Sequence, residues 1–185
     1  MKTRTPAAFL LCLALAPLAF AREIGGVNLA DTVTVDGKSL KLNGGGIRTK
    51  AIFKVYVAGL YLETPSQDAA TVVSSDQAKQ VRLSLLRGLD KSKITEAISE
   101  GFEKNSKAQM GALKARLDRF NAMIPDLEKG DQVIFTYVPG KGTMVSAKGA
   151  ERGSVEGKDF ADALFSVWLG ANPVQEDLKK AMLGG

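Results

Sequence analysis

The sequence predicts an α+β domain with a mainly antiparallel sheet and helices packed on one face of it. Segments with strand-like alternation and segments with helical spacing occur in blocks, in the order strands, helices, strands, helices. The regular strand–helix–strand alternation that a parallel sheet requires is missing. In addition, Asp36-Gly37 stands between two alternating runs, which is a strong hairpin signal.

The first half of the chain is typical of strands. Thr32–Val35 and Ser39–Leu42 flank the Asp-Gly turn, and we expect the glycines at 44–46 to end this pattern with a sharp turn. The β-branched and aromatic run at 52–63 is mostly apolar on both faces, which predicts a central, buried strand. Two further elements, a short helix and a strand, are expected over 67–75 and 81–87.

Helical spacing dominates the middle of the chain. With Asp90 as the predicted N-cap, one apolar stripe follows, formed by Ile94, Ala97, Ile98, Gly101 and Phe102. A second stripe, which Pro125 ends, is formed by Met110, Leu113, Leu117, Phe120 and Ile124. Both stripes predict helices with one face toward the sheet.

The last third predicts strands and then two helices. A strand is expected over 132–138, followed by a hairpin whose turn we place at 150–152. An amphipathic helix that Gly170 ends is predicted by Phe160, Leu164, Val167 and Trp168. Asn172-Pro173 predicts the start of a final helix, with proline in the first helical position.

The first residues predict a cleavable signal peptide. Lys2 and Arg4 precede a short apolar run at 7–16, and Ala19-Phe20-Ala21 provides small residues at a cleavage site. The apolar run is too short to span a membrane, which takes about 20 residues. We therefore expect residues 1–21 to be removed, residues 22–185 to form one domain in the periplasm or outside the cell, and no membrane span.

The composition excludes several kinds of chemistry. The chain has no histidine, and its only cysteine lies within the predicted leader. Zinc, copper and haem sites and catalytic triads with histidine are therefore excluded, and we expect no metal and no cofactor. The formal net charge of +5 falls by two when the leader is removed. No basic stripe carries interleaved aromatic residues, so we do not expect a nucleic-acid partner.

Two side chains are candidates for ligand binding. Arg48, beside apolar segments, is suited to hold a carboxylate or an enolate because its planar guanidinium donates two parallel hydrogen bonds. A solvated surface arginine is the alternative, and composition alone favours it. Tyr56 is either a core residue or a ligand contact, and its hydroxyl needs a partner if it is buried. On a straight strand the two residues lie roughly 26 Å apart, so they share a ligand only if the chain bends between them.

Two segments resemble the chalcone isomerase family, most closely its bacterial chalcone-isomerase-like branch. They are Leu42–Arg48 followed by Lys54–Glu63, and Gly157–Gly170 followed by Asn172–Val174. The resemblance follows the order of elements over nearly the whole chain after the leader. It implies an open-faced β-sandwich, a large antiparallel sheet with helices over one face and a ligand cleft between them.

The resemblance also bears on catalysis. In the plant enzymes of this family an arginine holds the substrate oxyanion during ring closure, and Arg48 matches it. The family's other polar site residues are replaced here, by Tyr56, Ile94, Gly101 and Ala161. An arginine and a tyrosine over an apolar cleft instead resemble the fatty-acid-binding branch of the family.

These observations favour a non-catalytic binder of a small apolar carboxylate such as a fatty acid. Arg48 would pair with the head group, Tyr56 would donate a hydrogen bond, and Ile94 and Phe102 would line the tail. One alternative is an intramolecular lyase of the chalcone isomerase type, an isomerase in which Arg48 is the catalytic residue. A second alternative is a structural or partner-binding protein with a closed cleft, so a protein partner also stays open.

Overall fold

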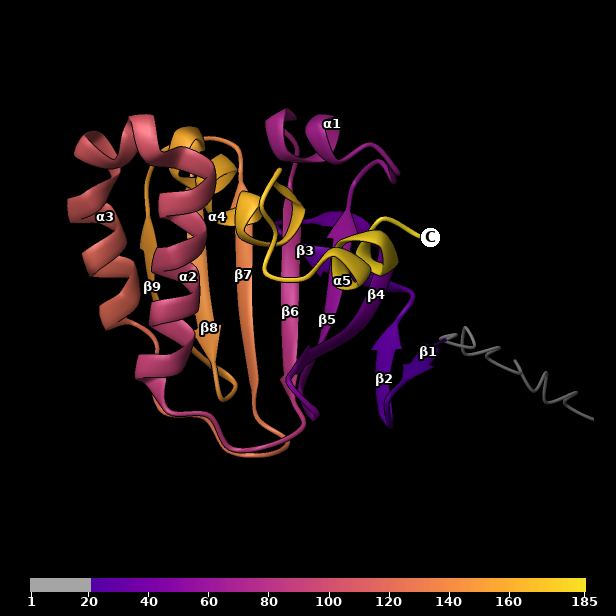
Figure 1. Cartoon of the computed structure of the whole chain (residues 1–185). Coiled ribbons are helices and arrows are strands. Elements are labelled where there is room, and N and C mark those ends of the chain that lie inside the picture. Colours follow the sequence, from indigo (N-terminus) through magenta and orange to yellow (C-terminus); the bar gives the residue numbers. More distant parts are fainter. Residues whose placement is uncertain (1–20) are drawn as a thin grey trace, which may run out of the picture.

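A seven-stranded antiparallel sheet is the centre of the fold (Figure 1). The computed structural model describes residues 21–185. The strand order is β3-β4-β5-β6-β7-β8-β9, so every strand pairs with its neighbours along the chain. A separate two-stranded hairpin, β1-β2, precedes the sheet. The predicted leader lies outside the described residues except for Ala21, the first residue of β1.

The elements have the following bounds. The strands are β1 (Ala21–Ile24), β2 (Val27–Ala30), β3 (Thr32–Val35), β4 (Lys38–Lys50), β5 (Phe53–Leu62), β6 (Lys79–Leu85), β7 (Gln132–Val138), β8 (Gly142–Ala147) and β9 (Ala150–Val155). The helices are α1 (Ala69–Ser74), α2 (Lys91–Ser106), α3 (Met110–Ala122), α4 (Lys158–Leu169) and α5 (Glu176–Met182), with a 3-10 turn, η1 (Lys107–Gln109), between α2 and α3.

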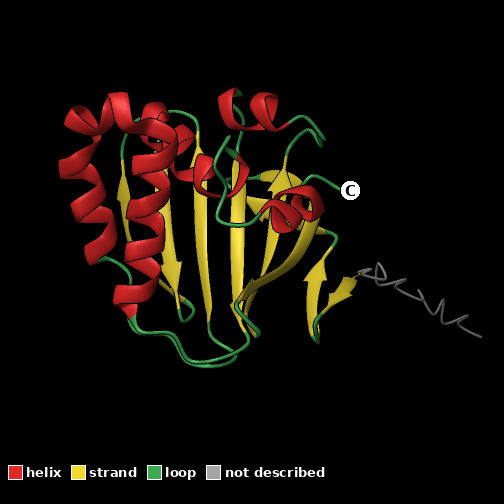
Figure 2. Cartoon of the chain, viewed as in Figure 1, coloured by secondary structure: helices red, strands yellow, loops and turns green. Residues whose placement is uncertain are grey.

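The helices α2, α3, α4 and α5 lie on one side of the sheet, as Figure 2 shows, and the main core fills the space between the layers. This arrangement confirms the predicted fold class. Four aromatic pairs with centroids 5.2–5.9 Å apart run through the core in the order Phe102, Phe160, Phe120, Phe135, Trp168. Each such contact adds about 0.5–1.5 kcal/mol beyond the burial of area. The helical layer is therefore fixed firmly to the middle of the sheet.

The predicted turn at Gly44–Gly46 is wrong, because β4 continues through all three glycines. A Cβ on Gly44 would lie 2.2 Å from the carbonyl oxygen of Ala181 in α5. On the other face, a Cβ on Gly45 would lie 2.7 Å from a methyl group of Leu29 in β2. The glycines thus let α5 and β2 approach opposite faces of one extended strand, a role that the sequence pattern does not distinguish from a turn.

Two other boundaries differ from the predictions. The β8-β9 turn lies at Lys148-Gly149, whose φ angles are 57° and 76°, and not at 150–152. The last helix begins at Glu176 with Gln175 as N-cap, so Asn172-Pro173 lies in the preceding loop. The predicted hairpin at Asp36-Gly37 is confirmed, with φ angles of 49° and 75°. Within residues 21–185, no helix combines the length and the apolar character needed to cross a bilayer.

Candidate functional site

A cleft of about 530 Å³ opens between α2 and the sheet. Its volume is within the range of about 300–1,000 Å³ that small-molecule sites occupy. The sheet contributes an apolar floor formed by Val55, Leu83, Leu85 and Val133. The opposite wall is α2, and the end of α4 and the following loop close one side with Val167, Trp168, Pro173 and Val174.

The structure brings Arg48 and Tyr56 together. They are directly paired residues on the neighbouring strands β4 and β5, so both side chains lie on the face that carries the helices. The chain reverses between them at Ala51, whose φ is 54°. This turn contains no glycine, proline, asparagine or aspartate, and for that reason the bend is not predictable from local residue types.

The Arg48 guanidinium is held by the backbone and by the start of α5. Its Nη1 donates to the Thr49 carbonyl oxygen at 2.6 Å and to Gln175 Oε1 at 3.1 Å. The same Gln175 oxygen accepts the Thr49 backbone N–H at 2.9 Å. Within residues 21–185, Nη2 and Nε of this arginine donate to no backbone carbonyl and to no carboxylate. The arginine is therefore oriented at one nitrogen and has further donors for a ligand.

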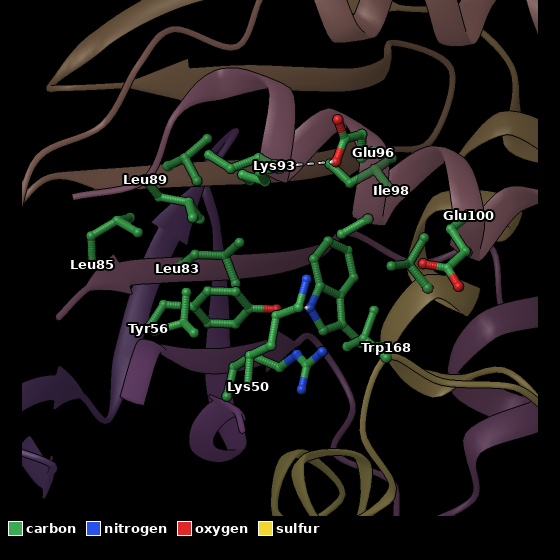
Figure 3. Close-up of a pocket in the computed structure, with 18 of the residues that line it drawn as sticks. Lys50, Tyr56, Leu83, Leu85, Leu89, Lys93, Glu96, Ile98, Glu100 and Trp168 are labelled. Carbon is green, nitrogen blue, oxygen red and sulfur yellow. Dashed lines mark hydrogen bonds and ion pairs between the residues drawn. The ribbon is translucent and has the colours of Figure 1, made fainter. Parts of the chain in front are cut away.

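The Tyr56 hydroxyl points toward the Trp168 indole, whose Nε1 donates to it at 3.1 Å (Figure 3). Burial raises the pKa of Tyr56, and the Trp168 hydrogen bond and the nearby Arg48 charge offset only part of that rise. The phenol is therefore neutral at physiological pH. Because its oxygen accepts from Trp168, its own proton is available to a ligand oxygen in the cleft.

The two residues predicted to line the tail of a ligand lie in different places. Ile94 lines the cleft, together with Ala97, Ile98 and Gly101 of the same helix. Phe102 is not part of the lining and is fully buried against Phe160, with centroids 5.4 Å apart. Phe102 thus supports the cleft wall from within the core.

Positive charge is in excess around the cleft. The cations of the lining are Arg48, Lys50, Arg87, Lys93 and Lys104, and the acids are Asp90, Glu96 and Glu100. Two of the acids are paired, Glu96 with Lys93 at 3.4 Å and Glu100 with Lys104 at 2.7 Å. Lys104 first, and Lys50 and Arg48 more weakly, lower the pKa of Glu100. This field favours an anionic ligand.

Sequence reasoning missed two residues of this site. The helical pattern places Trp168 on an apolar stripe, and it is 2% exposed, but its indole N–H faces the cleft and donates to Tyr56. A buried indole N–H needs a hydrogen-bond partner, and this need is the signal that could have identified Trp168. Gln175 gave no signal at all, because its role depends on the close approach of α5 to β4.

At three of the matched positions, the polar network of a ring-closing enzyme has no counterpart. Ala161 is fully buried in α4, away from the cleft, and Ile94 and Gly101 offer the cleft no hydroxyl or amide side chain. Gly101 serves packing instead, since a Cβ there would lie 2.8 Å from a Val167 methyl group. Within residues 21–185, no group of three or more carboxylates, histidines or cysteines could hold a metal ion.

Fold and site together define a sheet-and-helix domain whose cleft has an apolar floor and a paired arginine and tyrosine, Arg48 and Tyr56. Residues 21–184 match the model of the chalcone isomerase-like family, and the chain belongs to this family. Among solved structures, the fold is similar to that of a fatty-acid binding protein of Arabidopsis thaliana, with a TM-score of 0.69 and 16% sequence identity. The match covers 85% of this chain and 92% of the plant protein. No curated protein matches the sequence.

Proposed function

We propose that this protein is an exported, non-catalytic binder of a small apolar carboxylate such as a fatty acid. One observation carries the proposal: Arg48 and Tyr56 are paired across β4 and β5 at the polar end of an apolar cleft. The carboxylate would accept from Arg48 Nη2 or Nε and from the Tyr56 hydroxyl. The tail would extend along Leu83 and Ile94.

Three points support a binder over the alternatives. A charge-assisted hydrogen bond to a carboxylate contributes about 1.5–3 kcal/mol, so two donors account for useful affinity without any chemistry. Arg48 is the residue that matches the catalytic arginine of the plant enzymes, and three of the other matched positions, Ile94, Gly101 and Ala161, have lost their polar groups. The open volume of about 530 Å³ favours a ligand over a cleft closed by its own side chains. The similarity of the fold to that of the plant fatty-acid binding protein also agrees with this proposal.

Export is part of the proposal and depends on the first 21 residues, with their cations, apolar run and Ala-x-Ala site. Intact-mass measurement of protein purified from the periplasm of a bacterial host tests it. A mass corresponding to a chain that begins at Arg22 is expected. A full-length mass, or recovery only from the cytoplasm, would contradict export.

Calorimetric titration with palmitate and with hexadecanol tests the ligand class. The two probes share a tail length, but only palmitate has the carboxylate. We expect palmitate to bind more tightly, and Arg48→Ala to weaken palmitate binding about a hundredfold without affecting hexadecanol. Arg119→Ala, an exposed arginine of α3 paired with Glu156, is the matched control and should bind as wild type.

Each other outcome has a defined meaning. Equal palmitate binding by Arg48→Ala would disprove the head-group assignment. Absence of binding by the wild type, with a stable protein complex recovered by affinity purification, would favour the partner-binding alternative. Stereoselective flavanone formation from a chalcone above the spontaneous rate, lost in Arg48→Ala, would establish the isomerase instead.

A further inference from the structure

The tip of the β4-β5 hairpin is the most exposed apolar feature of the described chain. Ile52 is 86% exposed and Phe53 is 53% exposed, and these are the large apolar side chains that residues 21–185 leave open to solvent. Scattered single apolar residues on a surface need no explanation, but two adjacent ones at a projecting turn form a protruding apolar point. The turn itself does not require two large apolar side chains, because it is formed by the backbone at Ala51.

Cations surround this tip. Lys50 and Lys54 flank the apolar residues in sequence, and the Arg87 guanidinium lies 4.7 Å from the centroid of the Phe53 ring. No ion pair within residues 21–185 involves any of these three cations. Segment 50–54 contains no acidic residue. We call Lys50, Ile52, Phe53, Lys54 and Arg87 the hairpin tip.

Acidic side chains at the same end of the molecule are partly engaged elsewhere. Asp126 accepts the backbone N–H of Lys91 at 2.8 Å, and Asp131 pairs with Lys148 at 3.2 Å. Asp90, three residues after Arg87, also lines the cleft and forms no ion pair within residues 21–185, so the tip presents an apolar point beside three cations and one acid. Phe53 and Lys50 also line the cleft, so this tip lies at the mouth of the ligand site.

We propose that the hairpin tip docks this protein onto an anionic phospholipid surface, with Ile52 and Phe53 inserted at the headgroup level and the three cations facing lipid phosphates. Apolar and aromatic side chains flanked by lysine and arginine are the composition of interfacial membrane anchors. Each cation near an anionic leaflet adds to the attraction. Docking by itself does not require the proposed ligand, but it would place the mouth of the cleft against a source of fatty acids.

A second copy of the chain fits this surface less well. A stable protein interface takes about 800 Å² from each partner, which two side chains cannot supply. A symmetric contact at the tip would also bring the same three cations against one another. An anionic bilayer satisfies both the apolar residues and the charges.

Sedimentation with fatty-acid-free vesicles tests the proposal on exported protein, alongside gel filtration. One set of vesicles is phosphatidylcholine alone, and in the other about a third of the lipid is phosphatidylglycerol. We expect binding to the anionic vesicles, weakened at about 1 M salt, where the screening length falls to about 3 Å. The double variant Ile52→Ser/Phe53→Ser should lower the partition coefficient at least about tenfold. Any leader left on the chain is common to wild type and variant, so the difference reports on the tip.

A charge variant and its control separate the cations of the tip from net charge. Lys50→Gln/Lys54→Gln/Arg87→Gln should lose binding to anionic vesicles. The control Lys41→Gln/Lys107→Gln/Lys180→Gln removes the same amount of charge from exposed positions elsewhere. This control should retain most of the binding to anionic vesicles. In Ile52→Trp, emission should shift to shorter wavelength when anionic vesicles are added.

The proposal is overturned if the wild type ignores anionic vesicles, if the serine variant binds as well as wild type, or if both charge variants lose binding equally. A dimer that the serine variant converts to a monomer would also overturn it, because the tip would then be an interface between copies. These vesicles contain no fatty acid, so the result does not depend on whether the cleft binds one.

Discussion

Gly44→Ala is expected to loosen α5 from the sheet and to destabilise the protein. The new Cβ would lie 2.2 Å from the Ala181 carbonyl oxygen and 2.8 Å from the Gly184 nitrogen, and both are backbone atoms that no side-chain rotation can move. Either the core absorbs the extra methyl group, which costs about 1–3 kcal/mol, or α5 moves away. In the second case Leu178 and Met182, both buried, lose contacts of about 1.5–3 kcal/mol each.

We therefore expect the free energy of unfolding to fall by about 1–3 kcal/mol if the core absorbs the methyl group and by about 3–6 kcal/mol if α5 moves away. Urea unfolding followed by circular dichroism measures it, and with a slope of about 1–3 kcal/mol per molar urea the midpoint should fall by about 1 M or more. Palmitate affinity should fall as well, because Gln175 is the N-cap of α5 and accepts a hydrogen bond from Arg48.

Gly111→Ala is the matched control. It places the same methyl group at a position of α3 where nothing lies within 4 Å. A glycine in a helix costs about 0.5–1 kcal/mol relative to alanine, so this variant should be more stable than wild type. If Gly44→Ala were as stable as Gly111→Ala, our explanation of the glycines in β4 would be incorrect.

Two further variants test the hydroxyl of Tyr56 and the buried charge of Lys79. Tyr56→Phe removes one donor to the carboxylate and leaves the Trp168 indole N–H without its partner. Palmitate affinity should therefore fall about tenfold or more, and the free energy of unfolding by about 1–3 kcal/mol. Unchanged values in calorimetry and in urea unfolding would contradict the site geometry. Burial lowers the pKa of Lys79 from 10.5 to about 8, although Asp162 lies 3.6 Å away. The folded state then binds this proton less tightly than the unfolded chain, so the free energy of unfolding should rise between pH about 8 and about 10, and Lys79→Met should lack that rise. The same pH slope in both proteins would show that Lys79 keeps its proton in the folded state.

Patterns that depend on one strand or one helix were predictable from the sequence. The strand over 132–138 and the hairpin at Asp36-Gly37 were predicted where the structure has them. In both, the signal lies in the segment itself: alternation in one case, and residues that tolerate positive φ in the other. The block order of strands and helices predicted the packing of the helices on one face, and the family resemblance implied the same arrangement.

The site depended on contacts between distant segments and was only partly predictable. Arg48 and Tyr56 were recognised as candidates, but their pairing depends on a turn at Ala51 that carries none of the usual turn residues. Gln175 reaches Arg48 only because glycines in β4 admit α5. A single sequence specifies residue types and local spacing. It does not specify which backbone segments approach so closely that only glycine fits between them.

The order of strands has a consequence for how the protein folds. Because each strand pairs with its neighbour along the chain, most of the sheet can form through short loops, which favours rapid folding for a sheet of this size. The longest connection joins β6 and β7, whose strands are separated by α2 and α3, and a shorter one that contains α1 joins β5 and β6. We expect the β6-β7 pair to form late in folding. Leu83 and Leu85 of β6 and Val133 of β7 meet there as the floor of the cleft, so the ligand site would exist only once the chain is completely folded.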